Sequence, residues 1–203
     1  DIQAIYRNAK HLQELINDIL DISQIEASRL AVVKEKTDLR DTLLEAANMV
    51  RDLVDSKGLQ FSLELPVDLP EVWLDRTRIR QVVLNLLANA VRFTEEGTIT
   101  LSASYRNDDI VVSVRDTGIG ITKDDLERVF EEFYQIEDSL FKQQGGTGLG
   151  LTLSMHVVQH HGGRLWAESD GIAGHGSTFS FTIPTSADAK FIMTNPLSRT
   201  VVS

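Results

Sequence analysis

One amphipathic segment, Asp75–Thr94, constrains the fold of this chain more than any other stretch. Asp75 is a suitable N-cap, and the residues after it follow a helical period with one apolar face. That face comprises Ile79, Val82, Val83, Leu86, Leu87 and Ala90. Asn85, Asn89 and Arg92 form a second stripe, because they are spaced by four and three residues. Such a stripe suits a site for a metal, a phosphate and a flat group, although a solvated helix face would look similar.

Composition limits the class of protein. The 203 residues are 42% hydrophobic and 25% charged, which is ordinary for a globular domain. The net charge of -10 argues against a nucleic-acid partner. The absence of cysteine fits a reducing compartment, and no apolar run approaches the roughly 18 residues of a membrane span. We therefore expect a cytoplasmic domain, whether or not its parent protein is anchored in a membrane.

The remaining patterns alternate between helix and strand. The turns include a hairpin at Asn107–Asp109 and a segment, Pro66–Pro70, that leads to the central helix. Leu30–Thr37 is expected to be a connector. The order predicts an α/β (α+β) sandwich, in which helices cover one face of a mixed sheet. Further helices are expected at 38–56, 122–130 and 149–161, and strands at 59–65, 97–106, 110–116, 164–169 and 177–184.

Residues 1–30 predict one long amphipathic helix with a seven-residue repeat. Its wide apolar stripe favours a helical bundle, and no second such helix is present in the sequence. We expect self-association or a partner helix to cover it, since an exposed stripe would be a large apolar patch. The sequence begins inside this pattern without Met, so we expect a piece of a longer protein. Residues 185–203 have little pattern and are expected to be a peripheral or disordered tail.

Two glycine-containing motifs carry chemistry. Asp116–Gly120 reads DTGIG at the end of a strand, where glycines permit close backbone approach and the carboxylate can accept from an amine. A β-turn capped by Asp would look the same. Gly145–Leu151 reads GGTGLGL and opens directly into a helix, which makes a phosphate cradle of exposed N–H groups. It lacks the Lys and Ser/Thr of a P-loop and the preceding strand of a dinucleotide fold, while a flexible hinge remains an alternative.

Three aromatic residues lie close together in Phe130–Tyr134, which reads FEEFY. Core packing would account for them, and so would a role beside a ligand. The following residues, 135–144, are polar and without period, which predicts a mobile loop.

These motifs occur in an order that resembles the catalytic domains of sensor histidine kinases. The resemblance covers about residues 1–184 and includes the helix 1–30, which is similar to the second helix of the kinases' dimerisation and phosphotransfer domain. The family belongs to a wider ATPase superfamily shared with gyrase, certain chaperones and mismatch-repair ATPases. The implied domains are a partial dimerisation domain at 1–30 and an ATP-binding catalytic domain at 31–184.

The resemblance implies a role for each matching residue. Asn89 would ligate Mg²⁺, and Asn85 would support it near the phosphates. Arg92 stands where the family often has Lys and would bind phosphate through the forked N–H groups of its guanidinium. Phe93 would lie against adenine, and Asp116 would accept from its amine while Gly118 and Gly120 let the backbone pass. Residues 135–144 would be a lid that closes over ATP. The phosphate contacts would come from Lys142, Gly146, Thr147, Gly148, Leu149 and Gly150.

The histidines of the sequence do not match the family's phosphoacceptor, which lies on the first bundle helix before an acidic residue and a Leu-Arg-Thr-Pro type segment. His11 lies on the second helix and has no nearby acid to orient it. His160 and His161 stand at a helix end, where the helix dipole explains them better than a metal site does. No phosphoacceptor is therefore assigned, and His156 and His175 do not fit either.

Three functions remain open. The first is a protein-histidine kinase that uses Mg-ATP, a phosphoacceptor helix from the parent, and a response regulator, as a homodimer through residues 1–30. The second is an ATP hydrolase of the gyrase or chaperone type. Those relatives carry a water-activating Glu four residues before the metal-binding Asn, where this chain has Asn85, so transfer is favoured. The third is a non-catalytic dimerisation and nucleotide-sensing module. On its own the chain is expected not to autophosphorylate.

Overall fold

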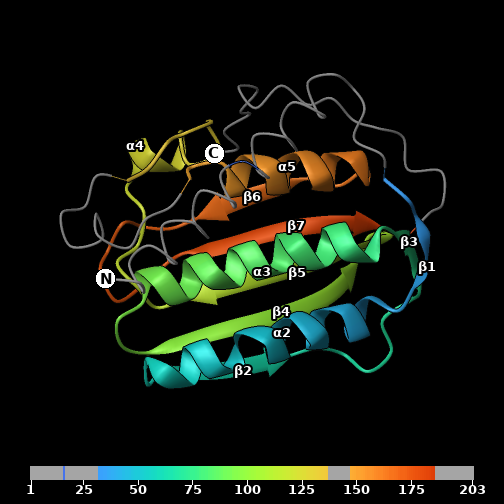
Figure 1. Cartoon of the computed structure of the whole chain (residues 1–203), viewed down its shortest axis with the longest axis horizontal. Helices are drawn as coiled ribbons and strands as arrows, with labels where there is room; N and C mark the ends of the chain where they lie inside the picture. Colours follow the sequence, from blue (N-terminus) through green and yellow to red (C-terminus); the bar gives the residue numbers. More distant parts are fainter. Residues whose placement is uncertain (1–15, 17–31, 137–146, 186–203) are drawn as a thin grey trace.

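A computed structural model describes residue 16, residues 32–136 and residues 147–185. In Figure 1 the long helices lie side by side in front of the five-stranded sheet, which is the expected sandwich with one face covered. The long helices are α2 (Leu39–Ser56), α3 (Arg76–Phe93) and α5 (Gly150–His160). The five-stranded sheet has the order β2-β4-β5-β7-β6, with bounds Gln60–Glu64, Thr98–Arg106, Asp109–Asp116, Thr178–Pro184 and Leu165–Glu168.

The sheet is mixed because its first pair is parallel. β2 runs parallel to β4, and the pairs β4–β5, β5–β7 and β7–β6 are antiparallel. β4 and β5 bury alternate residues, as expected for strands with one face on a core. Their hairpin turns at Asn107 and Asp108, which have φ of 50° and 65°, so the turn has the left-handed geometry that matches the strand twist.

The helices begin at the residues that the sequence indicates. The Asp38 carboxylate caps α2 and the Asp75 carboxylate caps α3, the latter by accepting from the backbone N–H of Arg78. α3 lies between α2 and α5 and buries its apolar face on the sheet. Its buried residues are Ile79, Val82, Val83, Leu86, Leu87, Ala90 and Val91.

Two details differ from the sequence prediction. β1 (Glu35–Thr37) lies in the expected connector, and β3 (Val72–Leu74) lies between the expected turn and the central helix, where no strand was expected. They pair as a two-stranded antiparallel sheet, which is too short for an alternation to stand out. The helix expected over 122–130 is only α4 (Lys123–Leu126), and turns follow it. Thr122 caps α4 as expected, by accepting from the backbone N–H of Asp125.

Most of the predicted long helix 1–30, much of the loop 135–144 and the tail lie outside the described residues. Within the part of the chain that the structure describes, no helix is both long and apolar enough to span a bilayer.

Candidate functional site

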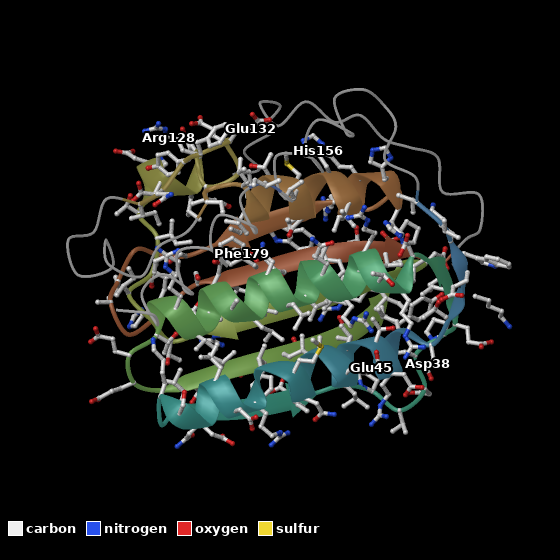
Figure 2. All side chains as sticks on the ribbon, viewed as in Figure 1. Asp38, Glu45, Arg128, Glu132, His156 and Phe179 are labelled. Atoms are coloured by element: carbon white, nitrogen blue, oxygen red, sulfur yellow. The ribbon has the colours of Figure 1, made fainter. Side chains whose placement is uncertain are left out.

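A cavity of about 430 Å³ lies between α3 and α5, above the ends of β5 and β7. In Figure 2, Phe179 of β7 lies between these two helices, and it lines the cavity. Most of the candidate site residues that the structure describes meet here, although they come from three separate stretches of sequence. Those on the cavity wall are Asn85, Asn89, Arg92, Phe93, Asp116, Gly120, Thr147, Gly148 and Gly150.

Two of the described candidates do not line the cavity in this way. Gly118 lies behind the wall, where it packs on the backbone of Phe93, and Leu149 is fully buried in the core. Lys142 and Gly146 lie outside the described residues. The roles expected for Lys142 and Gly146 therefore stay predictions.

Asp116 is the buried acidic group of the cavity, with 4% of its surface exposed. Its Oδ1 accepts from the backbone N–H groups of Gly118, at 2.8 Å, and Ser177, at 3.3 Å. Its Oδ2 accepts from the Ser177 hydroxyl at 2.6 Å. A carboxylate has about four lone-pair positions, so one position on Oδ2 is left for a donor inside the cavity. An amine or amide N–H of a ligand would fill it.

Gly118 is required by close packing. A Cβ at this position would lie 2.2 Å from the carbonyl oxygen of Phe93, which no side chain can tolerate without a backbone shift. The Phe93 carbonyl also accepts from the N–H of Ile119 at 3.3 Å. The turn that follows Asp116 is therefore seated directly on the end of α3.

Asn85 lies at the contact between α3 and α5. Its amide nitrogen donates to the Ser154 hydroxyl at 3.0 Å, and a Cβ on Gly150 would lie 2.4 Å from its amide oxygen. Asn85 thus holds the first turns of α5 against the middle of α3. One turn further along α3, the side chain of Asn89 is half-buried and makes no hydrogen bond to any other described residue.

Arg92 supplies positive charge at the cavity wall. Its guanidinium lies over the Phe93 ring, 5.0 Å from the centroid, as in a cation–π contact. Its Nε is buried and has no hydrogen-bond partner among the described residues. Burial lowers the pKa of Arg92 from its ordinary value, but an arginine stays charged near neutrality. A half-buried cation with a buried, unused donor is costly, and an anion in the cavity would compensate it.

The first turn of α5 provides backbone donors. Its N-cap, Leu149, makes no side-chain hydrogen bond, and no acidic residue stands in the first turn. Gly148 and Gly150, which flank it, both line the cavity, so the positive end of the helix dipole lies beside that space. The Thr147 hydroxyl accepts from the N–H of Leu149 at 3.1 Å and orders this entry.

The aromatic segment 130–134 closes the side of the cavity under α5. The Thr152 hydroxyl donates to the Phe130 carbonyl at 2.9 Å, and the Phe130 ring meets Phe179 edge to face at 6.3 Å. Tyr134 lines the cavity, donates its hydroxyl to Asp125, and carries the Arg128 guanidinium on its ring. Core packing therefore accounts for Phe130 and Tyr134, whereas Phe133 is 61% exposed, and a role of the segment beside a ligand stays a prediction.

Two site residues escaped the sequence reasoning. Ser177 binds Asp116 from the start of β7, and Ser154 binds Asn85 from the middle of α5. The pairing of Arg115 with Thr178 places Ser177 beside Asp116, so the predicted sheet contained a signal for it once the strand order was known. No signal in the sequence singles out Ser154.

Histidine 161 corrects one expectation. It is 2% exposed, and burial lowers its pKa, so it is neutral and the helix dipole does not explain its position. Its imidazole is instead held by two hydrogen bonds, to Val157 of its own helix and to Asp75 at the start of α3.

Comparison with known proteins gives a consistent result. A family model described as "Histidine kinase-, DNA gyrase B-, and HSP90-like ATPase" matches residues 74–187. The non-motile and phage-resistance protein of Caulobacter vibrioides is 42% identical over 90% of this chain and 22% of its own length. The circadian input-output histidine kinase CikA of Synechococcus elongatus is 40% identical over 90% of this chain and 24% of its own.

The structural comparison agrees with the sequence comparison. The crystal structure of full-length ShkA in complex with AMPPNP superimposes with a TM-score of 0.79 and 30% identity, over 93% of this chain and 39% of that one. The chain spans less than a quarter of the length of the Caulobacter and Synechococcus relatives named above.

Proposed function

Because the chain belongs to the histidine kinase-, DNA gyrase B- and HSP90-like ATPase family, we propose that it is the ATP-binding catalytic part of a sensor protein-histidine kinase. In this proposal it transfers the γ-phosphoryl group of ATP to a histidine of the parent protein, for relay to a response regulator. The proposed catalytic domain is residues 31–184, and residues 1–30 contribute to a homodimer.

The observation that carries the proposal is the combination of groups that line one cavity. Its wall has a buried acceptor, Asp116, with room for one donor, and it also has Arg92 and the first turn of α5. Adenine offers an exocyclic amine to the first, and the phosphates offer anionic oxygens to the second. Phe93, on the same wall, offers a ring face to a flat base.

The residues at the phosphate end also suit a magnesium ion. The amide oxygen of Asn89 is a hard ligand on the cavity wall, and no described residue occupies it. A bound Mg²⁺ would supply charge neutralisation on the β- and γ-phosphate oxygens. Asn85, which is already bonded to Ser154, would keep α5 at the correct distance for its N–H groups to contact the same phosphates.

The chemistry left to the protein is positioning. A neutral imidazole nitrogen attacks the γ-phosphorus, a nitrogen–phosphorus bond forms, and the bond to the β–γ bridging oxygen breaks to release ADP. Hydrolysis would need a base that activates water. Asn85 stands where the hydrolytic relatives carry that base, and an amide cannot take up the proton. Transfer is therefore favoured over hydrolysis.

The first test is nucleotide binding with and without Mg²⁺. We expect Asn89→Ala to abolish the dependence on Mg²⁺ while leaving residual binding. We expect Asp116→Ala to weaken binding about 10- to 100-fold and to reduce preference for adenine, since a charged acceptor of the base is lost. Isothermal titration with ATP and with inosine triphosphate measures both effects. If both variants bind like the wild type, the site assignment is wrong.

The second test concerns the acceptor. Incubation of this chain with γ-labelled ATP should give no acid-labile label on the chain itself. Adding the parent's phosphoacceptor helix should produce a label that is stable to base and labile to acid. An acid-labile label on the chain alone would contradict the assignment of an external acceptor, and steady release of phosphate without any acceptor would favour the hydrolase.

A further inference from the structure

His161 joins two helices at the end of the domain remote from the glycine turn. Its Nδ1 lies 2.7 Å from the Val157 carbonyl oxygen, and the backbone N–H of Asp75 donates to its Nε2 at 2.9 Å. A carbonyl can only accept and an N–H can only donate, so the imidazole is neutral with its proton on Nδ1. One ring therefore connects the end of α5 with the N-cap of α3.

The surroundings of His161 oppose its protonation. Burial lowers the pKa of the imidazole, and so do the nearby charges of Lys34 and His160, whereas the Val157 carbonyl and Asp75 raise it. A second proton would sit on Nε2 and point at the N–H of Asp75, so the hydrogen bond between them would be lost. The hydrogen bonds of His161 to Val157 and Asp75 can therefore form together only when its imidazole is neutral.

Asp75 extends the junction to a third segment. One carboxylate oxygen caps α3 through the N–H of Arg78 at 3.0 Å, and the other accepts from the N–H of Val33 at 3.1 Å. Val33 belongs to the stretch that leads into β1. Asp75 and His161 therefore hold together the entering chain, the start of α3 and the end of α5.

α3 and α5 are fixed to each other at two named points. One is the His161–Asp75 bond, and the other is the Asn85–Ser154 bond at the cavity, ten residues along α3 and hence about 15 Å away. Two separated bonds add to the apolar packing between the helices and restrain their crossing angle, whereas one bond restrains a single point. Loss of the bond at His161 would let the first turn of α5 tilt about Asn85, and that turn borders the phosphate end of the cavity.

We propose that His161 is a positioning residue for nucleotide binding, which in its neutral form sets the angle between α3 and α5 and releases it on protonation. This inference rests on the proposed function, since it assigns to the junction an effect on ATP affinity. The existence of the junction itself, a neutral Nδ1–H imidazole that bridges two helices, does not depend on the proposed function.

The first experiment reads the junction directly. Nitrogen-15 NMR of the histidine rings in the whole chain distinguishes the Nδ1–H from the more usual Nε2–H tautomer and follows each ring through its titration. We expect His161 to be an Nδ1–H imidazole that titrates below the ordinary value of about 6.5. An Nε2–H tautomer at neutral pH, or titration above that value, would overturn the proposal.

The second experiment measures the affinity for a fluorescent trinitrophenyl ATP from about pH 8 to about pH 5, across the range in which imidazole titrates. The variants are His161→Gln and His156→Gln. Glutamine can place a non-titrating oxygen near the position of Nε2, so the backbone N–H of Asp75 keeps its hydrogen-bond acceptor. His156 is a matched control, because it lies on the same helix (Figure 2) and burial lowers its pKa as well.

We expect the wild type and His156→Gln to lose about tenfold in affinity as His161 becomes protonated, the effect of one buried hydrogen bond. His161→Gln should bind almost equally across the range. An equal loss in His161→Gln would overturn the proposal. If the wild type binds no nucleotide at any pH, the proposed function is wrong, and the NMR titration still decides whether the junction exists.

Discussion

The carboxylate of Asp116 accepts three hydrogen bonds from Gly118 and Ser177 in a nearly closed environment. Hydrogen bonds to a buried charge are stronger than those between neutral groups, because little water is available to solvate the charge. The sequence indicated Asp116, since it ends a strand pattern in front of a glycine. It did not indicate Ser177, whose partner lies 61 residues away, or Ser154, whose partner lies 69 away. A hydroxyl inside a strand or helix pattern carries no local sign of its use.

Replacing Ser177 tests the value of that hydroxyl. We expect Ser177→Ala to lower the free energy of unfolding by about 1–3 kcal/mol, because Oδ2 of Asp116 loses a buried donor. It should also weaken ATP binding, since the carboxylate is free to turn. Urea unfolding and titration calorimetry measure the two effects.

Ser180→Ala is the control for this replacement. Ser180 is equally buried on the opposite face of β7, where its hydroxyl meets that of Ser113 at 2.8 Å. Its loss should cost stability without a change in nucleotide affinity. Equal effects of the two replacements on binding would show that Ser177 does not orient Asp116.

At the scale of elements, the contact between α3 and α5 decides the shape of the site. Both helices were expected, because their apolar periods and end signals are local. Their periods did not predict that they meet, because the Asn85 stripe shows only that the residues share a face and does not say what faces them; the family resemblance implied that they do. The short β1–β3 sheet and the early end of α4 escaped for a related reason. Three or four residues are too few for a period, so tertiary contacts decide their conformation.

Gly150→Ala tests how closely α5 must approach α3. A Cβ here would collide with the amide oxygen of Asn85 and push that side chain away from Ser154. Alanine favours the helix by roughly 0.5–1 kcal/mol, so we expect little net change in stability but a clear loss of ATP affinity. In an Asn85→Ala background the same replacement should have almost no further effect on binding. Additive losses in this double-mutant cycle would contradict the contact.

Lys57 completes the end of α3. Its ammonium donates to the carbonyl oxygens of Val91, at 2.8 Å, and Thr94, at 3.3 Å, which α3 leaves without helical partners. We expect Lys57→Met to lower the free energy of unfolding by about 1 kcal/mol, measured by urea denaturation. Lys36→Met removes an exposed ion pair with Glu71 and should change stability by less than about 0.5 kcal/mol. A Lys57 variant as stable as the Lys36 variant would refute this role.

For the whole molecule, local patterns were sufficient to predict a mixed sheet with helices on one face. The strand order β2-β4-β5-β7-β6 was not predictable from those patterns, because only long-range pairing determines it. That order brings the DTGIG turn of β5 next to the start of β7 and under α3 and α5. The cavity is therefore a product of topology, and the family resemblance, more than any period, indicated that the motifs would meet.

Three histidines at the end of α5, of which His161 is buried and His156 and His160 are half-buried, make the stability of the whole domain depend on pH. Burial lowers the pKa of His156, His160 and His161, so each takes up a proton more readily in the unfolded chain. Their contribution to stability is complete above the ordinary pKa of about 6.5 and is lost as the pH falls through the folded-state values. We expect the urea midpoint to fall between about pH 7 and pH 5, and less steeply in His161→Gln. A midpoint that rises on acidification would contradict the burial of these rings.

A guanine base would present a carbonyl oxygen where adenine presents an amine. That oxygen would face the negatively charged carboxylate of Asp116. Because a carbonyl oxygen has no hydrogen to donate, the remaining lone pair on Oδ2 would stay without a hydrogen bond. No rotation of the carboxylate relieves the repulsion, since Gly118 and Ser177 hold it on both sides. A cell's pool of GTP would then compete poorly for the proposed site, and phosphate transfer by the proposed kinase would follow the supply of ATP and not that of GTP.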